Sequence, residues 1–257
     1  MQNVVVTGAS SGIGAALARR YAGQGARLLL IGRDAARLAS VAQECGAQAA
    51  LVETARVDVR ERAAMAAVLR DFDGRHPVDV VVANAGVTSV LAPDATVETA
   101  EAFERVLETN LIGASNTVAP VAERMAARGA GRIGLVGSIA GLRGLPYSPA
   151  YCASKAGLKA MGEAMRARLR PRGVSVTIAS IGFVVTPLDD SIASPKPLRM
   201  TPERAAARVA AAIGAGRAHV AFPLPLAAAA RILALLPPRL GDALLRQVAV
   251  SPRKIGE

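Results

Sequence analysis

With 257 residues, 52% of them hydrophobic, and no fixed repeat or Ser/Gly linker, the chain predicts one α/β domain rather than two. A formal net charge of +11 invites a nucleic-acid partner, but aromatic residues make up only 3% and do not alternate with basic ones, so we expect none. Two widely separated cysteines and two histidines give no metal-ligand spacing and suit a reducing compartment. The first residues, MQNVVVTGAS, lack a signal-peptide pattern, which favours a cytoplasmic protein.

The first motif is a glycine-rich turn, TGASSGIG, between a predicted strand from Asn3 to Val6 and a helical pattern. Backbone N–H groups and the helix dipole at such a helix N-terminus favour an anion. Gly8 permits the turn, Gly12 lets a pyrophosphate approach, and Gly14 allows close helix–strand packing. A tight turn without a ligand is the alternative. We expect a dinucleotide to be bound here by Gly8, Ser10, Ser11, Gly12, Ile13 and Gly14.

A second predicted strand, Arg27 to Ile31, ends at a position that bears on cofactor choice. In dinucleotide folds an acid about 20 residues after the glycines binds the ribose 2′-hydroxyl, whereas an arginine suits a 2′-phosphate. Gly32 stands where the acid would be and Arg33 follows it, which favours NADP(H) over NAD(H). Alternatively, Arg33 is only an exposed residue beside a helix that Asp34 caps, and NAD(H) stays an open choice.

The next predicted strands and helices alternate along the chain. One strand ends at Asp58-Val59, and a buried strand from Val78 to Ala83 ends at Asn84-Ala85-Gly86. This alternation predicts an α/β, doubly wound Rossmann domain with a mostly parallel, seven-stranded sheet. Because ligands bind beyond the carboxyl ends of such strands, the expected cofactor-binding residues also include Asp58, Val59, Asn84, Ala85 and Gly86.

Two polar residues precede the catalytic pair described next. Asn110 lies in a predicted long helix among apolar neighbours and needs a partner; a satisfied buried amide is the structural alternative. Ser138 ends a predicted strand from Arg132 to Val136, thirteen residues before Tyr151. The intervening stretch is irregular by composition, so Ser138 can approach the Tyr151 face.

Tyr151 and Lys155 lie four residues apart in a helical run and so share one helix face. A cation beside a phenol lowers the pKa of the phenol towards the range in which general acid–base catalysis is efficient. The alternative is an ordinary helix with a buried tyrosine and a lysine whose charged end reaches solvent. YxxxK alone does not separate the two interpretations.

Together, TGASSGIG, NAG, Asn110, Ser138 and YxxxK resemble the short-chain dehydrogenase/reductase family over roughly Asn3 to Thr186. The resemblance implies a catalytic tetrad in which Tyr151 is the acid in reduction and the base in oxidation, and Ser138 holds the substrate oxygen. It further implies that Lys155 lowers the Tyr151 pKa and binds the nicotinamide ribose, and that Asn110 helps to hold a water. Family positions also place Gly182, Val184, Thr186, Tyr151 and Lys155 against the cofactor.

Some positions depart from the family pattern. Ile181-Gly182 replaces the usual Pro-Gly after the sixth strand, whereas Thr186, expected at the nicotinamide carboxamide, is retained. Ser11 replaces a basic residue that many NADP-dependent relatives carry. These differences raise a question about the loop geometry and not about the use of a dinucleotide.

The remaining chain predicts a lid and a tail. Residues 186–199 hold three prolines and no periodicity, which is typical of a mobile lid over a substrate. Thr201-Pro202 predicts a helix start, and His219 to Phe222 a last strand. We expect residues 1–222 to form the dinucleotide-binding and catalytic domain, and 223–257 an amphipathic helical extension of it.

The extension has apolar stripes at helical spacing, one of which runs from Leu244 to Val248, with Arg231, Arg253 and Lys254 among its basic residues. It has no uninterrupted apolar run long enough for a membrane span. A subunit contact or a substrate-pocket helix is one interpretation, and a peripheral membrane contact is the other. A homodimer or homotetramer is expected.

These features predict an NADP(H)-dependent oxidoreductase that acts on CH–OH donors and interconverts a carbonyl group and a primary or secondary alcohol on a hydrophobic small molecule. No metal is expected. An NAD-dependent alcohol dehydrogenase is the alternative enzyme. A redox sensor that holds NADP(H) without turnover is the alternative from another class, but such a protein has no need of Tyr151.

Overall fold

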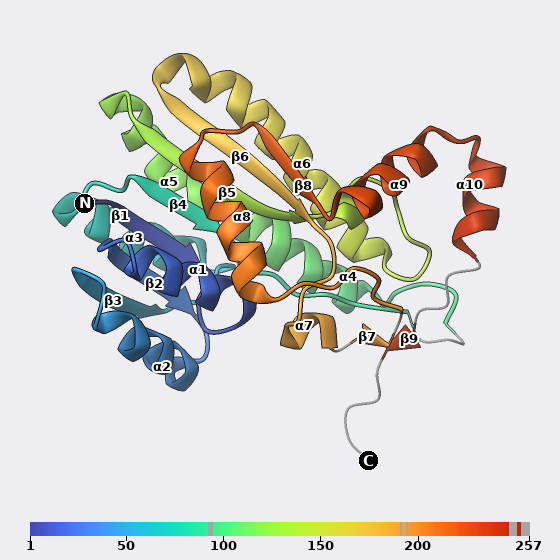
Figure 1. Cartoon of the computed structure of the whole chain (residues 1–257), viewed down its shortest axis with the longest axis horizontal. Coiled ribbons are helices and arrows are strands. Elements are labelled where there is room, and N and C mark those ends of the chain that lie inside the picture. The colour runs from blue at the N-terminus through green and yellow to red at the C-terminus, as the bar shows by residue number, and fades with distance from the viewer. Residues whose placement is uncertain (92–94, 191, 194, 247–250, 253–257) are drawn as a thin grey trace.

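A seven-stranded parallel sheet forms the centre of the molecule (Figure 1). The structure, a computed structural model, describes residues 1–91, 95–190, 192–193, 195–246 and 251–252. The strand order is β3-β2-β1-β4-β5-β6-β8. The bounds are β1 (Asn3–Thr7), β2 (Arg27–Gly32), β3 (Leu51–Arg56), β4 (Val80–Ala83), β5 (Gly131–Ser138), β6 (Val174–Ile181) and β8 (His219–Phe222). The predicted doubly wound fold is confirmed, and every pair in this sheet is parallel.

Two helical layers cover the sheet because its central strands are apolar on both faces. Val4 and Val6 of β1 face one core cluster, and Val5 faces the other. The first cluster is covered by α1 (Gly12–Ala22), α2 (Ala35–Gly46) and α8 (Pro202–Gly214). The second is covered by α3 (Arg62–Arg75), α5 (Gly113–Arg128) and α6 (Pro149–Leu169).

The predicted long helix after Glu98 is interrupted. It consists of α4 (Ala100–Leu107), a π-helical turn (Glu108–Ile112) and α5. Asn110 lies in the π-helical turn, which the sequence analysis did not predict. A 3₁₀ turn (Ile139–Gly141) follows β5, and another (Arg170–Arg172) ends α6.

The segment predicted to be a mobile lid over the substrate, residues 186–199, contains short regular elements, and its role as a lid stays a prediction. It includes α7 (Pro187–Asp190) and β7 (Ile192–Ala193), and β7 pairs antiparallel with β9 (Ser251–Pro252). The carboxylate of Asp189 lies 2.7 Å from Nε of Arg199. Ion pairing between residues ten positions apart can order a segment that has no periodic pattern. The predicted cap of α8 is confirmed, since Thr201 accepts a hydrogen bond from the Arg204 amide.

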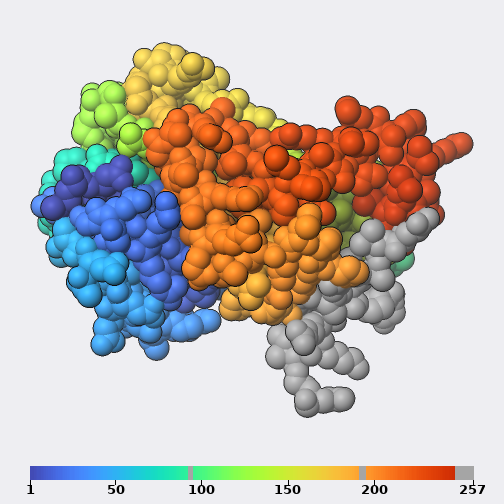
Figure 2. All heavy atoms as spheres, viewed as in Figure 1, coloured from blue at the N-terminus to red at the C-terminus, as the bar shows by residue number. Residues whose placement is uncertain are grey.

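The C-terminal extension is helical, as expected, and consists of α9 (Leu224–Leu235) and α10 (Pro238–Leu245). Both helices stand out at one end of the molecule (Figures 1 and 2). Val248, Arg253 and Lys254 lie outside the described residues. Among the helices of the described part, none has the length and apolar character needed to cross a membrane.

Candidate active site

A cavity of about 790 Å³ opens at the carboxyl ends of the parallel strands. Its walls come from the loops after β1, β2, β3, β4, β5 and β6, from α6, and from the C-terminal extension. Every residue predicted to bind the cofactor or to act in catalysis lines it, except Gly14 and Asn110. The parallel topology therefore gathers residues that lie up to about 180 positions apart in the sequence.

The glycine-rich loop forms a cradle that only glycine fits. Gly8 and Gly12 have φ angles of +64° and +53°, which residues other than glycine rarely adopt. A Cβ on Gly8 would lie 2.8 Å from the Ala85 Cα, and one on Gly12 would lie 2.9 Å from Cγ2 of Thr186. The Ser11 side chain makes no capping bond to α1, so the helix N-terminus faces the cavity uncapped by it. This arrangement fits a dinucleotide phosphate.

Gly14 and Asn84 shape the loop from behind. A Cβ on Gly14 would lie 2.1 Å from the Gly8 carbonyl oxygen, which confirms the close packing predicted for this position. The Asn84 side chain donates to the carbonyls of Thr7 at 2.9 Å and Gly8 at 3.3 Å, while its backbone N–H donates to the Thr7 hydroxyl. Asn84 thus ties the loop after β4 to the loop after β1.

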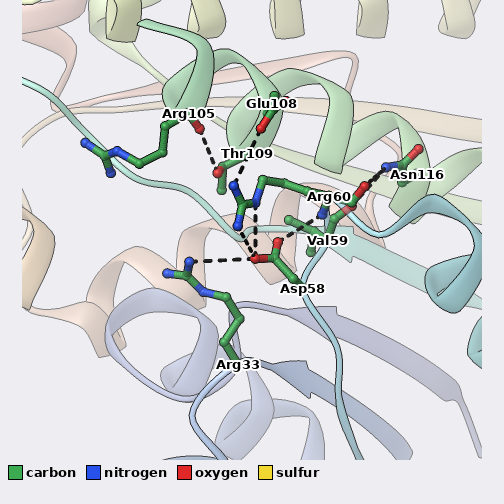
Figure 3. A network of polar contacts seen from close by, with 8 residues as sticks. All are labelled: Arg33, Asp58, Val59, Arg60, Arg105, Glu108, Thr109 and Asn116. Carbon is green, nitrogen blue, oxygen red and sulfur yellow. Dashed lines mark hydrogen bonds and ion pairs between the residues drawn. The ribbon is translucent and has the colours of Figure 1, made fainter. Parts of the chain in front are cut away.

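At the end of the cavity beside β2 and β3, where residues that would hold the adenosine part of a dinucleotide are expected, Asp58 lies between Arg33 and Arg60 (Figure 3). Arg60 donates to its carboxylate from Nη2 at 2.9 Å and Nε at 3.1 Å, whereas Nη1 of Arg33 lies 3.8 Å away. Hydrogen bonds from Arg60, followed by smaller effects that include Arg33, hold the pKa of Asp58 below its usual value. Because Arg60 already neutralises Asp58, the guanidinium of Arg33, exposed over 62% of its side chain, keeps its donors available to the cavity.

The prediction that Asp34 caps the next helix is confirmed, because the Asp34 side chain accepts a hydrogen bond from the Arg37 amide at the start of α2. Arg37 itself lies in the first turn of α2, lines the cavity and was missed by the sequence analysis. Its Nε donates to Asp34 at 2.6 Å.

At the catalytic end, Ser138, Tyr151 and Lys155 meet on the cavity wall. Ser138 is the last residue of β5 and accepts a hydrogen bond from the Ala140 amide at 3.1 Å, which orients its hydroxyl. Lys155 is buried, donates to the Val136 carbonyl at 3.0 Å, and places Nζ 5.7 Å from the centroid of the Tyr151 ring. The arrangement gathers two hydroxyl groups and one cation around one position.

The pKa values differ from the expectation for Lys155. Burial raises the pKa of Tyr151 to about 12, while hydrogen bonding by Ser138 acts in the opposite direction. Burial also lowers the pKa of Lys155 to about 8. Desolvation is the largest cause of both shifts, and Lys155 is not among the groups that lower the pKa of Tyr151 in the protein alone.

The polar side-chain atoms of Asn110 are hydrogen-bonded to other residues of the protein. Its side chain accepts from the Val87 amide at 2.8 Å and donates to the Val87 carbonyl and the Ser154 hydroxyl, each at 2.9 Å. It is buried and does not line the cavity. These contacts are those of a satisfied buried amide, which the sequence analysis held as the alternative.

The opposite wall contains residues that the sequence analysis did not single out as site residues. Ala230 and Leu233 of α9 and Leu245 of α10 line the cavity, next to Arg143. Arg143 binds Asp242 of α10 at 2.7 Å. A substrate-pocket helix was one of the interpretations of the extension, but the Arg143–Asp242 pair could not be found from local pattern, because 99 residues separate the two partners.

Fold and site together define a Rossmann-type, dinucleotide-dependent oxidoreductase. The profile of the family described as "short chain dehydrogenase" matches residues 2–197. An uncharacterized oxidoreductase of Myxococcus xanthus is 36% identical over 96% of this chain and 97% of its own length.

Solved structures are also similar. A short-chain dehydrogenase from Mycobacterium paratuberculosis bound to NAD has a TM-score of 0.79 and 25% identity, covering 88% of this chain and 98% of the other. One from Sphingobium yanoikuyae in complex with NADPH has a TM-score of 0.80 and 24% identity, covering 100% and 98%. The chain belongs to the short-chain dehydrogenase/reductase family and is an NAD(P)-dependent enzyme.

Proposed function

We propose that the protein interconverts a carbonyl group and a primary or secondary alcohol on a hydrophobic small molecule, using NADP(H). The observation that carries this proposal is the meeting of Ser138, Tyr151 and Lys155 on the wall of a cavity that begins at the glycine-rich loop. When bound, the nicotinamide supplies or accepts hydride.

Each catalytic residue has a role that its surroundings support. Tyr151, held protonated by burial, donates a proton to the carbonyl oxygen in reduction and takes it back in oxidation. Ser138 donates a second hydrogen bond to that oxygen, where negative charge grows in the transition state. Lys155 holds the nicotinamide ribose with its charged end beside Tyr151. Asn110 supports the site through Val87 and Ser154, and a water that it helps to hold stays a prediction.

A hydrophobic substrate is supported by the far wall of the cavity, to which α9 and α10 contribute Ala230, Leu233 and Leu245. A steady-state assay with a panel of aldehydes and ketones, from short polar to long apolar, tests the activity. We expect kcat/KM to rise with the apolar size of the carbonyl compound. No turnover with any carbonyl compound, together with tight NADPH binding, would favour the redox sensor.

The NADP(H) preference rests on Arg33 and on the missing acid at position 32. A guanidinium can donate two charge-assisted hydrogen bonds to a 2′-phosphate, so kcat/KM should favour NADPH over NADH by about ten- to a hundredfold. Gly32→Asp with Arg33→Ala should reverse the preference; a Cβ at position 32 would have its nearest neighbours at 3.5 Å, an ordinary contact. Arg37→Ala is the matched control, with a smaller effect because Asp34 already binds that guanidinium. Equal efficiency with both cofactors would contradict the assignment to NADP(H).

Assembly and location are part of the same proposal. A homodimer or homotetramer, in the cytoplasm or with a peripheral membrane contact, would cover the outer face of α9, where Leu224, Ile232 and Leu235 are 73%, 60% and 86% exposed. We also propose that the protein does not bind nucleic acid.

A further inference from the structure

The helix that carries Tyr151 is not capped by its own N-terminal residues. Ser148, at the N-cap position of α6, makes no side-chain capping bond, and Pro149 has no N–H to donate. The first N–H of the helix belongs to Ala150, which is fully buried. This N–H donates to Oε2 of Glu98 at a distance of 2.6 Å, and Glu98 lies 52 positions earlier in the chain.

Glu98 links this helix end to the loop that follows β4. Its other carboxylate oxygen accepts a hydrogen bond from the Ser89 hydroxyl. Two residues further along, the Leu91 amide donates to the Tyr147 carbonyl at 2.9 Å. The loop is therefore attached to the segment just before α6 by backbone and side-chain bonds together.

A second attachment lies on the other side of Tyr151. Asn110 bonds to Val87 in the same loop and to the hydroxyl of Ser154, three residues after Tyr151. Ser154 in turn donates to the Tyr151 carbonyl at 2.8 Å. The first turn of α6 is thus held at Ala150 by Glu98 and at Ser154 by Asn110, with Tyr151 between the two.

We propose that Glu98 is a positioning residue for Tyr151: as an N-cap supplied from outside the helix, it holds the first turn of α6 in the place where the phenol meets the substrate oxygen. The inference rests on the proposed role of Tyr151. A helix end without a cap frays, and the first turn is the part that moves. A displacement of about 1 Å of a reacting group is enough to lower the rate strongly, whereas the glycine-rich loop and the loops after β2 and β3, which would bind much of the cofactor, lie outside this link.

The test compares Glu98→Ala with Glu98→Gln. Glutamine keeps an oxygen that can accept from Ala150 and an amide that can donate to Ser89, whereas alanine loses both links. Glu104→Ala is the matched control, since Glu104 is an exposed carboxylate on α4 for which no side-chain bond is found among the described residues. We expect kcat for a carbonyl substrate to fall about tenfold in Glu98→Ala, at most threefold in Glu98→Gln, and not at all in the control.

Two further readouts separate positioning from a general loss of structure. The dissociation constant for NADPH, by fluorescence titration, should change less than twofold in all three variants. Hydrogen exchange of the peptide that spans 148–155 should accelerate in Glu98→Ala only. Ser89→Ala leaves the Glu98 carboxylate in place but removes its hydrogen bond to the loop, and it should lower kcat about threefold. This variant replaces Glu98→Ala in the test if Glu98→Ala does not fold.

The proposal is overturned if Glu98→Ala keeps kcat within twofold of the wild type. It is also overturned if Glu98→Gln loses as much as Glu98→Ala, or if cofactor affinity falls in step with kcat. If the proposed function is wrong, the results differ from these. Tyr151→Phe would then stay active, while hydrogen exchange at the start of α6 would still accelerate in Glu98→Ala.

Discussion

At the residue scale, the phenol of Tyr151 is the proton donor, so the variant Tyr151→Phe keeps the ring and loses only the transferable proton. We expect turnover to be abolished while the dissociation constant for the cofactor stays nearly unchanged. Lys155→Ala should damage both quantities. Steady-state kinetics and a fluorescence titration measure them. A kcat above about a tenth of the wild-type value in Tyr151→Phe would mean that another group donates the proton.

Lys155 makes folding stability depend on pH. Burial lowers its pKa from 10.5 to about 8 in the folded protein, whereas the unfolded chain keeps the proton up to about pH 10.5. Between these values the unfolded state binds more protons, so the free energy of unfolding contributed by this residue rises with pH. The destabilising contribution is present in full below about pH 8.

Urea unfolding of the cofactor-free wild type and of Lys155→Met isolates this contribution. The difference in unfolding free energy, wild type minus variant, should rise between pH 8 and pH 10, by at most about 1.4 kcal/mol per pH unit. Other titrating groups, such as Tyr151, cancel to a first approximation because both proteins contain them. A difference that does not change with pH would mean that Lys155 stays charged when the protein is folded.

At the scale of elements, α10 is attached to the cavity wall through few contacts. The Arg143–Asp242 ion pair joins it to the loop after β5, and Gly241 lets the two approach, since a Cβ there would lie 3.3 Å from Nη2 of Arg143. Asp242→Ala should raise KM for an apolar carbonyl substrate about two- to fivefold with kcat nearly constant, because an exposed ion pair contributes at most about 1 kcal/mol. Arg239→Ala, on the same helix, is the control. Unchanged KM in Asp242→Ala would show that α10 keeps its place without the pair.

At the scale of the whole molecule, the extension has two different faces. The inner face contributes to the cavity, while the outer face exposes Leu224, Ile232 and Leu235. Truncation after Pro223 removes α9 and α10 and leaves all seven strands of the sheet. We therefore expect a folded core with an altered oligomeric state or a raised substrate KM, measured by light scattering and kinetics.

Binding of the intact protein to vesicles that contain anionic lipid tests the membrane contact separately, since Arg residues accompany the apolar side chains of the extension. An unchanged mass, an unchanged KM and no vesicle binding would together leave the extension without any of the proposed roles.

Local patterns in the sequence were enough to predict the seven strands of the parallel sheet, the glycine-rich loop and most of the polar residues that line the cavity. Gly8 and Gly12 are required by their positive φ angles, Gly14 by its packing against the nearby Gly8 carbonyl, and the spacing of Tyr151 and Lys155 is a property of one helix, so residues close in sequence carry that information. Parallel topology then brings the strand ends together.

The surroundings of each group, in contrast, depend on contacts between segments that are far apart in the sequence. Burial raises the pKa of Tyr151 beyond what the nearby lysine suggested, Arg60 rather than Arg33 neutralises Asp58, and Glu98 caps a helix that starts 51 residues later in the chain. Desolvation and capping from a distance depend on which segments meet in space. Contacts between distant parts of the chain leave no periodic trace in the sequence, whereas helices, strands and turns do.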